Sequence, residues 1–162
     1  MKKLYIQQKV FKITDHYPIL DENDEVVYYV DQDFAFFGLN VTVSDKNHNE
    51  IFVITRELLH YLPEFVITFA NGDVARLKSR FRLFYKKIDV IFPSMDISIE
   101  GDFLSHNFVI KNGDKEIGQM KRELFTIADR FEIEIYDEEY MDIIVAFMIA
   151  IDHLIDIARS AN

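Results

Sequence analysis

One third of the basic residues of the chain gather in one short segment. Residues 76–87 contain six of the 18 basic side chains and none of the 28 acidic ones. The six are Arg76, Lys78, Arg80, Arg82, Lys86 and Lys87. Because the first four alternate with apolar or small residues, a β-strand here would direct them to one face. Such a row of cations can bind phosphate groups, for example those of a phospholipid head group.

A structural role is the competing interpretation of this basic segment, residues 76–87. Charged side chains on adjacent strands commonly pair, and the chain offers 28 carboxylates as partners. Cross-strand pairing is therefore the favoured interpretation. Recognition of an anionic lipid, or of a protein partner, is the functional hypothesis.

Two adjacent residues near the C-terminus, Asp152 and His153, are the candidates for catalysis. A carboxylate beside an imidazole can act as a general acid–base pair, which leads to the alternative hypothesis of a small-molecule enzyme with a pocket near these two residues, at the end of the expected barrel. The competing interpretation is a polar end of a helix. Asp142 and Asp152 would then anchor that helix by accepting hydrogen bonds from the surrounding sheet, because a buried carboxylate must be paired.

The usual signatures of enzymes and metalloproteins are missing from the sequence. It contains no G-x-S-x-G nucleophile elbow, no Walker or dinucleotide-binding glycine loop and no H-E-x-x-H motif. The five histidines lie far apart in the chain, without the spacing of a metal-binding helix or finger. We therefore expect no metal and no cofactor, and the sequence favours a non-enzymatic protein.

Length and composition indicate one soluble domain spanning residues 1–162. Apolar residues make up 49% of the chain, which is enough for a packed core, and the net charge of −10 disfavours nucleic acid as a partner. There is no cysteine, as is usual in a reducing compartment, and the start of the chain lacks the apolar stretch of a signal peptide. These features predict a cytoplasmic protein.

Short stretches rich in Val, Ile, Phe and Tyr, separated by polar turns, predict about twelve antiparallel strands between residues 4 and 136. The expected strands are 4–13, 17–21, 25–32, 36–45, 50–56, 64–70, 73–82, 83–92, 95–100, 107–111, 115–122 and 130–136. Asn71-Gly72 and Asn112-Gly113 are strong hairpin signals. Each follows a Phe-Val-Ile stretch, which suggests a degenerate internal repeat without a fixed period.

The pattern changes at Asp137, where a helix over about residues 138–159 is predicted. Residues 143–151 are all apolar, and Asp137 is a candidate N-cap. A helix that is apolar on every side must be enclosed. Acidic residues interrupt the segment, so we expect no transmembrane span. A barrel of about twelve strands is wide enough to hold a helix about 10 Å across.

The sequence resembles the YxjI-like, LURP-one-related proteins along almost its whole length. The similar stretches are Leu4-Tyr5-Ile6-Gln7-Gln8-Lys9, Ile99-Glu100-Gly101-Asp102-Phe103, Phe108-Val109-Ile110, Lys121-Arg122-Glu123-Leu124, Phe131-Glu132-Ile133-Glu134-Ile135 and Ala150-Ile151-Asp152. This resemblance implies a tubby-like fold, a closed twelve-stranded barrel around a hydrophobic C-terminal helix.

The resemblance implies much less about function, because one fold supports many activities. Relatives by fold include tubby, whose similar domain binds phosphoinositide head groups, and the phospholipid scramblases. The bacterial branch has no settled activity. The basic segment is similar to a phosphoinositide-binding surface only in its charge, and no individual ligand residue of tubby can be matched to it.

Overall fold

The computed structural model describes residues 1–7, 16–33, 38–57, 62–79, 88–123 and 130–160, which form a sheet of 12 strands and a C-terminal helix. The strands are β1 (Lys2–Gln7), β2 (His16–Asp21), β3 (Val26–Asp33), β4 (Asn40–Asp45), β5 (Glu50–Glu57), β6 (Glu64–Phe69), β7 (Val74–Ser79), β8 (Ile88–Ile91), β9 (Ile97–Asp102), β10 (Asn107–Asn112), β11 (Lys115–Glu123) and β12 (Arg130–Ile135). The helices are the short η1 (Phe103–Ser105) and η2 (Glu138–Tyr140) and the long α2 (Met141–Ser160).

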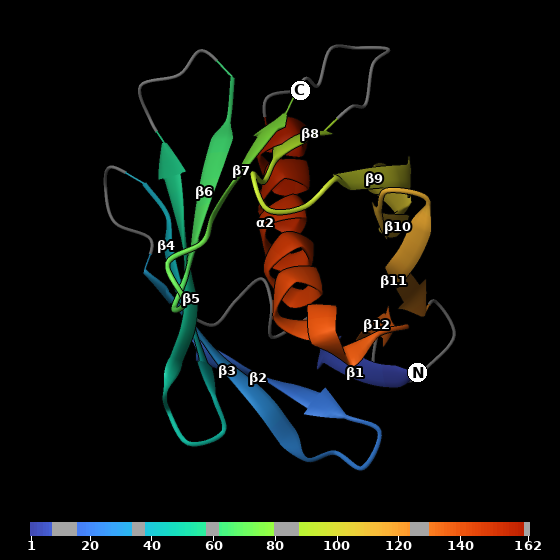
Figure 1. The fold of residues 1–162 in the computed structure, drawn as a ribbon. Helices are drawn as coiled ribbons and strands as arrows, with labels where there is room; N and C mark the ends of the chain where they lie inside the picture. Colours follow the sequence, from blue (N-terminus) through green and yellow to red (C-terminus); the bar gives the residue numbers. More distant parts are fainter. Residues whose placement is uncertain (8–15, 34–37, 58–61, 80–87, 124–129, 161–162) are drawn as a thin grey trace.

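The strands form one antiparallel sheet that curves into a nearly closed barrel. Consecutive strands pair with each other except β8 and β9, which form the two edges, and the order is β8-β7-β6-β5-β4-β3-β2-β1-β12-β11-β10-β9. The pairing of β1 with β12, from Lys2 opposite Ile135 to Gln7 opposite Arg130, joins the two ends of the strand region. Figure 1 shows the sheet passing around α2, with β4–β7 on one side of the helix and β9–β12 on the other.

The predicted mainly β architecture is confirmed, and each predicted strand overlaps one observed strand. The largest differences lie at strand ends. The expected strands 4–13 and 83–92 are described only over Lys2–Gln7 and Ile88–Ile91, because residues 8–15 and 80–87 lie outside the described residues.

The C-terminal helix begins where the sequence predicts. The carboxylate of Asp137 accepts a hydrogen bond from the backbone N–H of Glu139 at 3.2 Å, which is the expected N-cap. The first turn is the 3-10 helix η2, and the α-helix continues to Ser160. A hydrogen bond from Lys115 helps to lower the pKa of Asp137, so this cap stays ionised. No helix among the described residues is long and apolar enough to span a bilayer.

Helix α2 supplies the centre of the core. All twelve residues from Ile144 to Ile155 are buried. Most strands alternate between buried and more exposed positions, as along β4, where Val41 and Val43 are buried and face the interior, whereas β6 and β12 are buried at nearly every position. The aromatic ring of Phe92 meets Phe147 of the helix edge-on, at 6.3 Å between ring centroids.

One glycine lets the helix lie close to the sheet. A Cβ atom on Gly118 of β11 would come within 2.9 Å of Ile144 Cδ1 and within 2.9 Å of the backbone oxygen of Glu134. The backbone oxygen cannot move without breaking the pairing of β11 with β12. Gly118 is therefore required by packing.

Three consecutive hairpins repeat with a period of 24 residues, since their first strands begin at residues 16, 40 and 64. Each turn has a left-handed residue at the same place, Asp24, His48 and Gly72. In the first two turns an aspartate oxygen accepts the backbone N–H two residues later at 2.8 Å. The sequence interpretation found an echo between other segments and missed this period, although Asn23, Asn47 and Asn71 mark it.

We predict that Gly118→Val destabilises the barrel by about 1–3 kcal/mol, because the new side chain overlaps Ile144 and a backbone carbonyl. Urea unfolding followed by circular dichroism measures the change. Thr68→Val is the matched control, since it introduces the same side chain at an exposed position of a strand, on β6. Equal losses in the two variants would contradict the packing argument.

Candidate functional site

A buried histidine and a buried aspartate connect the helix to the barrel. His106 follows η1 and Asp152 lies in the second half of α2, and their side chains are 0% exposed. His106 Nε2 lies 2.8 Å from Asp152 Oδ1. The ring of His106 also packs on Phe131 of β12, at 4.8 Å between centroids. The pair therefore fixes one point of the helix against the region where β9 leads into β10.

The same pair leaves two polar atoms without hydrogen-bond partners in the described part of the chain, His106 Nδ1 and Asp152 Oδ2. Tyr17 of β2 is also fully buried, and its pKa is raised by burial and by the negative charge of Asp152. The second half of α2 thus meets a small polar cluster within an otherwise apolar interior.

His153, the second residue of the predicted catalytic pair, faces another part of the wall. Its ring stacks on Phe65 of β6, with centroids 6.3 Å apart, and the residue is 9% exposed. Burial lowers the pKa of His153, because desolvation disfavours the charged imidazolium. The neutral ring is therefore the form that the barrel favours.

The side chains of the two candidate catalytic residues, Asp152 and His153, contact different partners. The hydrogen bond of Asp152 goes to His106, while the ring of His153 packs on Phe65. Since Asp152 is fully enclosed, a substrate could reach it only if the barrel opened. Asp152 therefore anchors the helix, which is the competing interpretation of the sequence. Its partner is the histidine His106, where a backbone or Arg donor was expected.

A second aspartate anchors the first turn of α2. The hydroxyl of Tyr28 in β3 donates a short hydrogen bond to Asp142 Oδ1. Tyr28 is 2% exposed, and burial raises its pKa, with the hydrogen bond to Asp142 adding to the effect. The phenol therefore remains a neutral donor. The expected anchoring role of Asp142 is thus present, with a tyrosine on the barrel as its partner.

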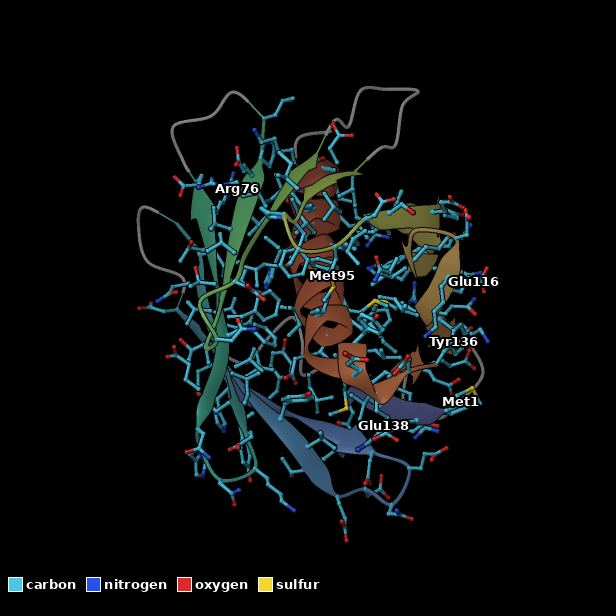
Figure 2. The ribbon with its side chains drawn as sticks, viewed as in Figure 1. Met1, Arg76, Met95, Glu116, Tyr136 and Glu138 are labelled. Atoms are coloured by element: carbon cyan, nitrogen blue, oxygen red, sulfur yellow. The ribbon has the colours of Figure 1, made fainter. Side chains whose placement is uncertain are left out.

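Arg76 and Lys78, the first two cations of the basic segment, alternate with buried residues along β7 and so lie on the outer face of the barrel, where Figure 2 labels Arg76. The side chains of Arg76 and Lys78 in β7 are 44% and 43% exposed. Both lie near the buried carboxylate of Glu64 in β6, with Arg76 Nη1 3.0 Å from Oε1 and Lys78 Nζ 3.6 Å from Oε2. The shared carboxylate holds the two cations side by side.

These two cations have acids on both neighbouring strands. Lys78 is registered opposite Glu64 on β6 and opposite Asp89 on β8. In this part of the wall the two positive charges of Arg76 and Lys78 are therefore matched by two negative charges, those of Glu64 and Asp89. The other predicted ligands of an anion, Arg80, Arg82, Lys86 and Lys87, lie outside the described residues.

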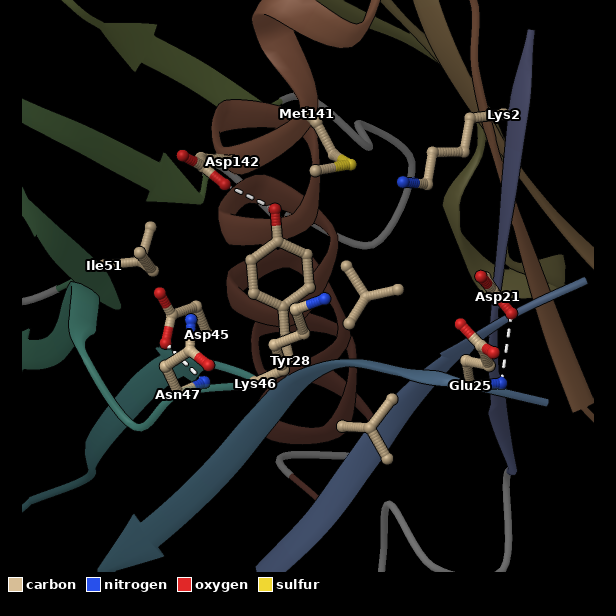
Figure 3. A pocket seen from close by; sticks show the side chains of 12 residues that line it. Lys2, Asp21, Glu25, Tyr28, Asp45, Lys46, Asn47, Ile51, Met141 and Asp142 are labelled. Carbon is tan, nitrogen blue, oxygen red and sulfur yellow. Dashed lines mark hydrogen bonds between the residues drawn. The ribbon is translucent and has the colours of Figure 1, made fainter. Parts of the chain in front are cut away.

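A pocket of about 440 Å³ opens at the end of the barrel where α2 begins (Figure 3). Its apolar lining comes from β3, β5 and the first residue of α2, namely Val26, Val27, Tyr28, Ile51 and Met141. Its charged lining is Lys2, Asp21, Glu25, Asp45, Lys46 and Asp142. The sequence interpretation missed this pocket, because it forms where two hairpin turns meet the start of the helix.

The fold and its enclosed helix define the class of protein: a nearly closed antiparallel barrel whose central helix is bonded to the wall through two acidic side chains, the buried Asp152 and the partly exposed Asp142. The sequence matches the LURP-one-related family over residues 2–152. The chain therefore belongs to the LURP-one-related family, as the resemblance of its motifs predicted.

The chain is also similar to two known proteins. The uncharacterised protein YxjI of Bacillus subtilis (strain 168) is 21% identical over 152 residues, which are 94% of this chain and 93% of that protein. The X-ray structure of a protein from Arabidopsis thaliana superposes with a TM-score of 0.67 at 16% identity. This match covers 94% of the chain and 90% of the plant protein, and it shows that the two share a fold.

We predict strong coupling between His106 and Asp152. Asp152→Leu leaves the buried His106 Nε2 without its partner and destabilises the protein by about 1–3 kcal/mol. His106→Leu has a similar effect. The double variant loses less than the sum of the two, because neither polar group is then left alone. Urea unfolding of all four proteins measures the coupling, and strictly additive losses would contradict the anchoring role.

We predict that the free energy of unfolding depends on pH, because the pKa of His153 is lowered in the folded protein from its ordinary value of 6.5. Above pH 6.5 both the folded and unfolded states are neutral at this residue, so stability is unaffected. As the pH falls below 6.5, the unfolded chain takes up the proton first and the free energy of unfolding decreases until the folded state also titrates.

The measurement is urea unfolding at a series of pH values between about 7.5 and 5. His153→Phe preserves an aromatic ring against Phe65 and removes the titrating group. We expect this variant to lose less stability than the parent over that range. The same slope in both proteins would show that His153 does not cause the dependence.

Proposed function

We propose that the protein is a non-catalytic binding module that recognises an anionic group through the basic segment. The observation that carries the proposal is that the basic segment begins on the outer face of the barrel, at Arg76 and Lys78. They stand on the outer face of β7 with more than two-fifths of each side chain exposed, at the start of a stretch of six cations without an acid. Their alternation directs them to the same side of the strand.

The charge balance indicates which cations would supply the affinity. Glu64 and Asp89 lie beside Lys78, so Arg76 and Lys78 have little excess charge to offer an anion. Residues 80–87 add four more cations and no acid to the sequence. We therefore assign the ligand contact mainly to Arg80, Arg82, Lys86 and Lys87.

Phosphate on a lipid head group is the anion that we favour. We assign the barrel to the tubby-like fold, which the whole-chain likeness to the plant structure supports. In tubby a similar domain binds phosphoinositide head groups. Since an exposed row of cations is attracted to the anionic leaflet of a membrane, the same use suits the basic segment. With no cysteine in the chain, we place this activity in the reducing environment of the cytoplasm.

The enzyme hypothesis has less support. It requires a substrate to reach Asp152 and His153, which are 0% and 9% exposed. Asp152 is already hydrogen-bonded to His106, and His153 is stacked on Phe65. Both residues make the contacts expected of core residues, and a binding function does not depend on access to them.

Binding to vesicles tests the proposal. The parent protein is mixed with phosphatidylcholine vesicles, with and without phosphatidylserine, and with inorganic phosphate as a soluble competitor. We expect binding that requires the anionic lipid and decreases as salt is raised. Neutralising residues 80, 82, 86 and 87 to Gln should weaken binding at least about tenfold, because each cation near an anionic surface contributes about 1 kcal/mol.

The matched control neutralises four cations elsewhere in the barrel. These are Lys2, Lys46, Arg56 and Lys111. The two variants have the same net charge, so only the position of the cations differs. The lipid proposal fails if the parent does not bind the anionic vesicles, or if the control variant loses as much affinity as the first.

A further inference from the structure

We propose that the pocket at the start of α2 binds a small organic cation that carries an apolar body, such as an alkyl or aralkyl primary amine. The pocket forms between the β2–β3 turn, the β4–β5 turn and the first residues of the helix (Figure 3). It shares no residue with the basic segment. This inference therefore stands or fails independently of the proposed lipid binding.

The size and the apolar lining of the pocket suit a small molecule. Its volume of about 440 Å³ lies within the range of small-molecule sites. Val27, Ile51 and Met141 line it, remain partly exposed and pack against the core. An apolar ligand body placed on these side chains would remove their surface from water, which is the main favourable term in such binding.

The two turns that border the pocket are held in place by their own hydrogen bonds. Asp21 Oδ1 accepts the backbone N–H groups of Asn23 and Glu25 at 2.8 and 3.0 Å. Asp45 Oδ1 accepts those of Asn47 and Asn49 at 2.8 and 2.9 Å. Because these walls are already ordered, a ligand would lose little free energy in ordering them.

The charge of the lining selects the sign of the ligand. Four carboxylates face two ammonium groups around the pocket, which leaves an excess of two negative charges. The hydrogen bonds from Asn49 and Asn47 lower the pKa of Asp45, so it remains ionised. The bond from Tyr28 fixes the carboxylate of Asp142 in place. This arrangement favours a cation and repels an anion.

An organic cation fits the lining better than a metal ion. Among the residues that the structure describes, no group of three or more His, Asp or Glu side chains is close enough together to hold a metal. The acids instead lie at separate points around an apolar floor. Such a lining suits one ammonium group together with a hydrocarbon body.

Three probes of the same shape and different charge test the inference on the full chain. They are 2-phenylethylammonium, the neutral 2-phenylethanol and the anionic 3-phenylpropanoate, each titrated up to about 10 mM. Methyl resonances in nuclear magnetic resonance spectra report where each probe binds. We expect the ammonium to shift the methyl groups of Val27, Ile51 and Met141, and the propanoate to bind at least roughly fivefold more weakly.

Two variants of the β2–β3 turn distinguish binding in the pocket from a general electrostatic attraction of the cation to the acidic turn. Glu25 lines the pocket, whereas Asp24 in the same turn does not, and both are exposed. Glu25→Gln should weaken binding of the ammonium about threefold or more, while Asp24→Asn leaves it within about twofold. Both variants change the net charge equally, and Asn tolerates the left-handed backbone of residue 24.

Several results would overturn the inference. These are no binding of the ammonium, equal binding of the propanoate, shifts that map away from the pocket, or equal losses in the two variants. Vesicle binding by the same preparation reports separately on the basic segment. Failure of one proposal is therefore distinguishable from failure of the other.

Discussion

The constraint on which the rest of the structure depends is the burial of a helix that is apolar on every side. All residues of α2 from Ile144 to Ile155 are buried, and a single sheet face could cover only part of their surface. The sheet must therefore pass around the helix. That requirement explains the 12 strands, the pairing of β1 with β12 that joins the strand region into a barrel, and the glycine at position 118, where a larger residue would overlap the helix.

An apolar helix in an apolar barrel has little to fix its depth or rotation, because hydrophobic contact is not directional. Two acidic residues on α2 supply the direction. Asp142 accepts a hydrogen bond from Tyr28 near one end of the barrel, and Asp152 pairs with His106 within the core. Because hydrogen bonds are directional, these two contacts select one depth and one rotation of the helix. The same burial explains why Asp152 and His153 are poor candidates for catalysis.

Two polar surfaces of the molecule differ in the sign of their charged side chains. Arg76 and Lys78 of the basic segment lie on the outer face of β7, beside Glu64. The pocket lies where α2 begins, and its lining has more acidic than basic side chains. Such a charge distribution can orient the protein on a charged partner and separate two ligands of opposite sign. The acidic total of the sequence therefore says little about any one surface.

The sequence by itself determined the elements of this protein. Twelve strands and the capped C-terminal helix follow from apolar patterning and turn residues, because these are local properties. The anchoring role of Asp142 and Asp152 was one of two interpretations, since the need to pair a buried carboxylate is general. Only the tertiary structure decided their partners. His106 lies 46 residues from Asp152, and Tyr28 lies 114 residues from Asp142. The pocket and the balance of Lys78 between Glu64 and Asp89 likewise depend on strand register, which brings together residues that no local pattern relates.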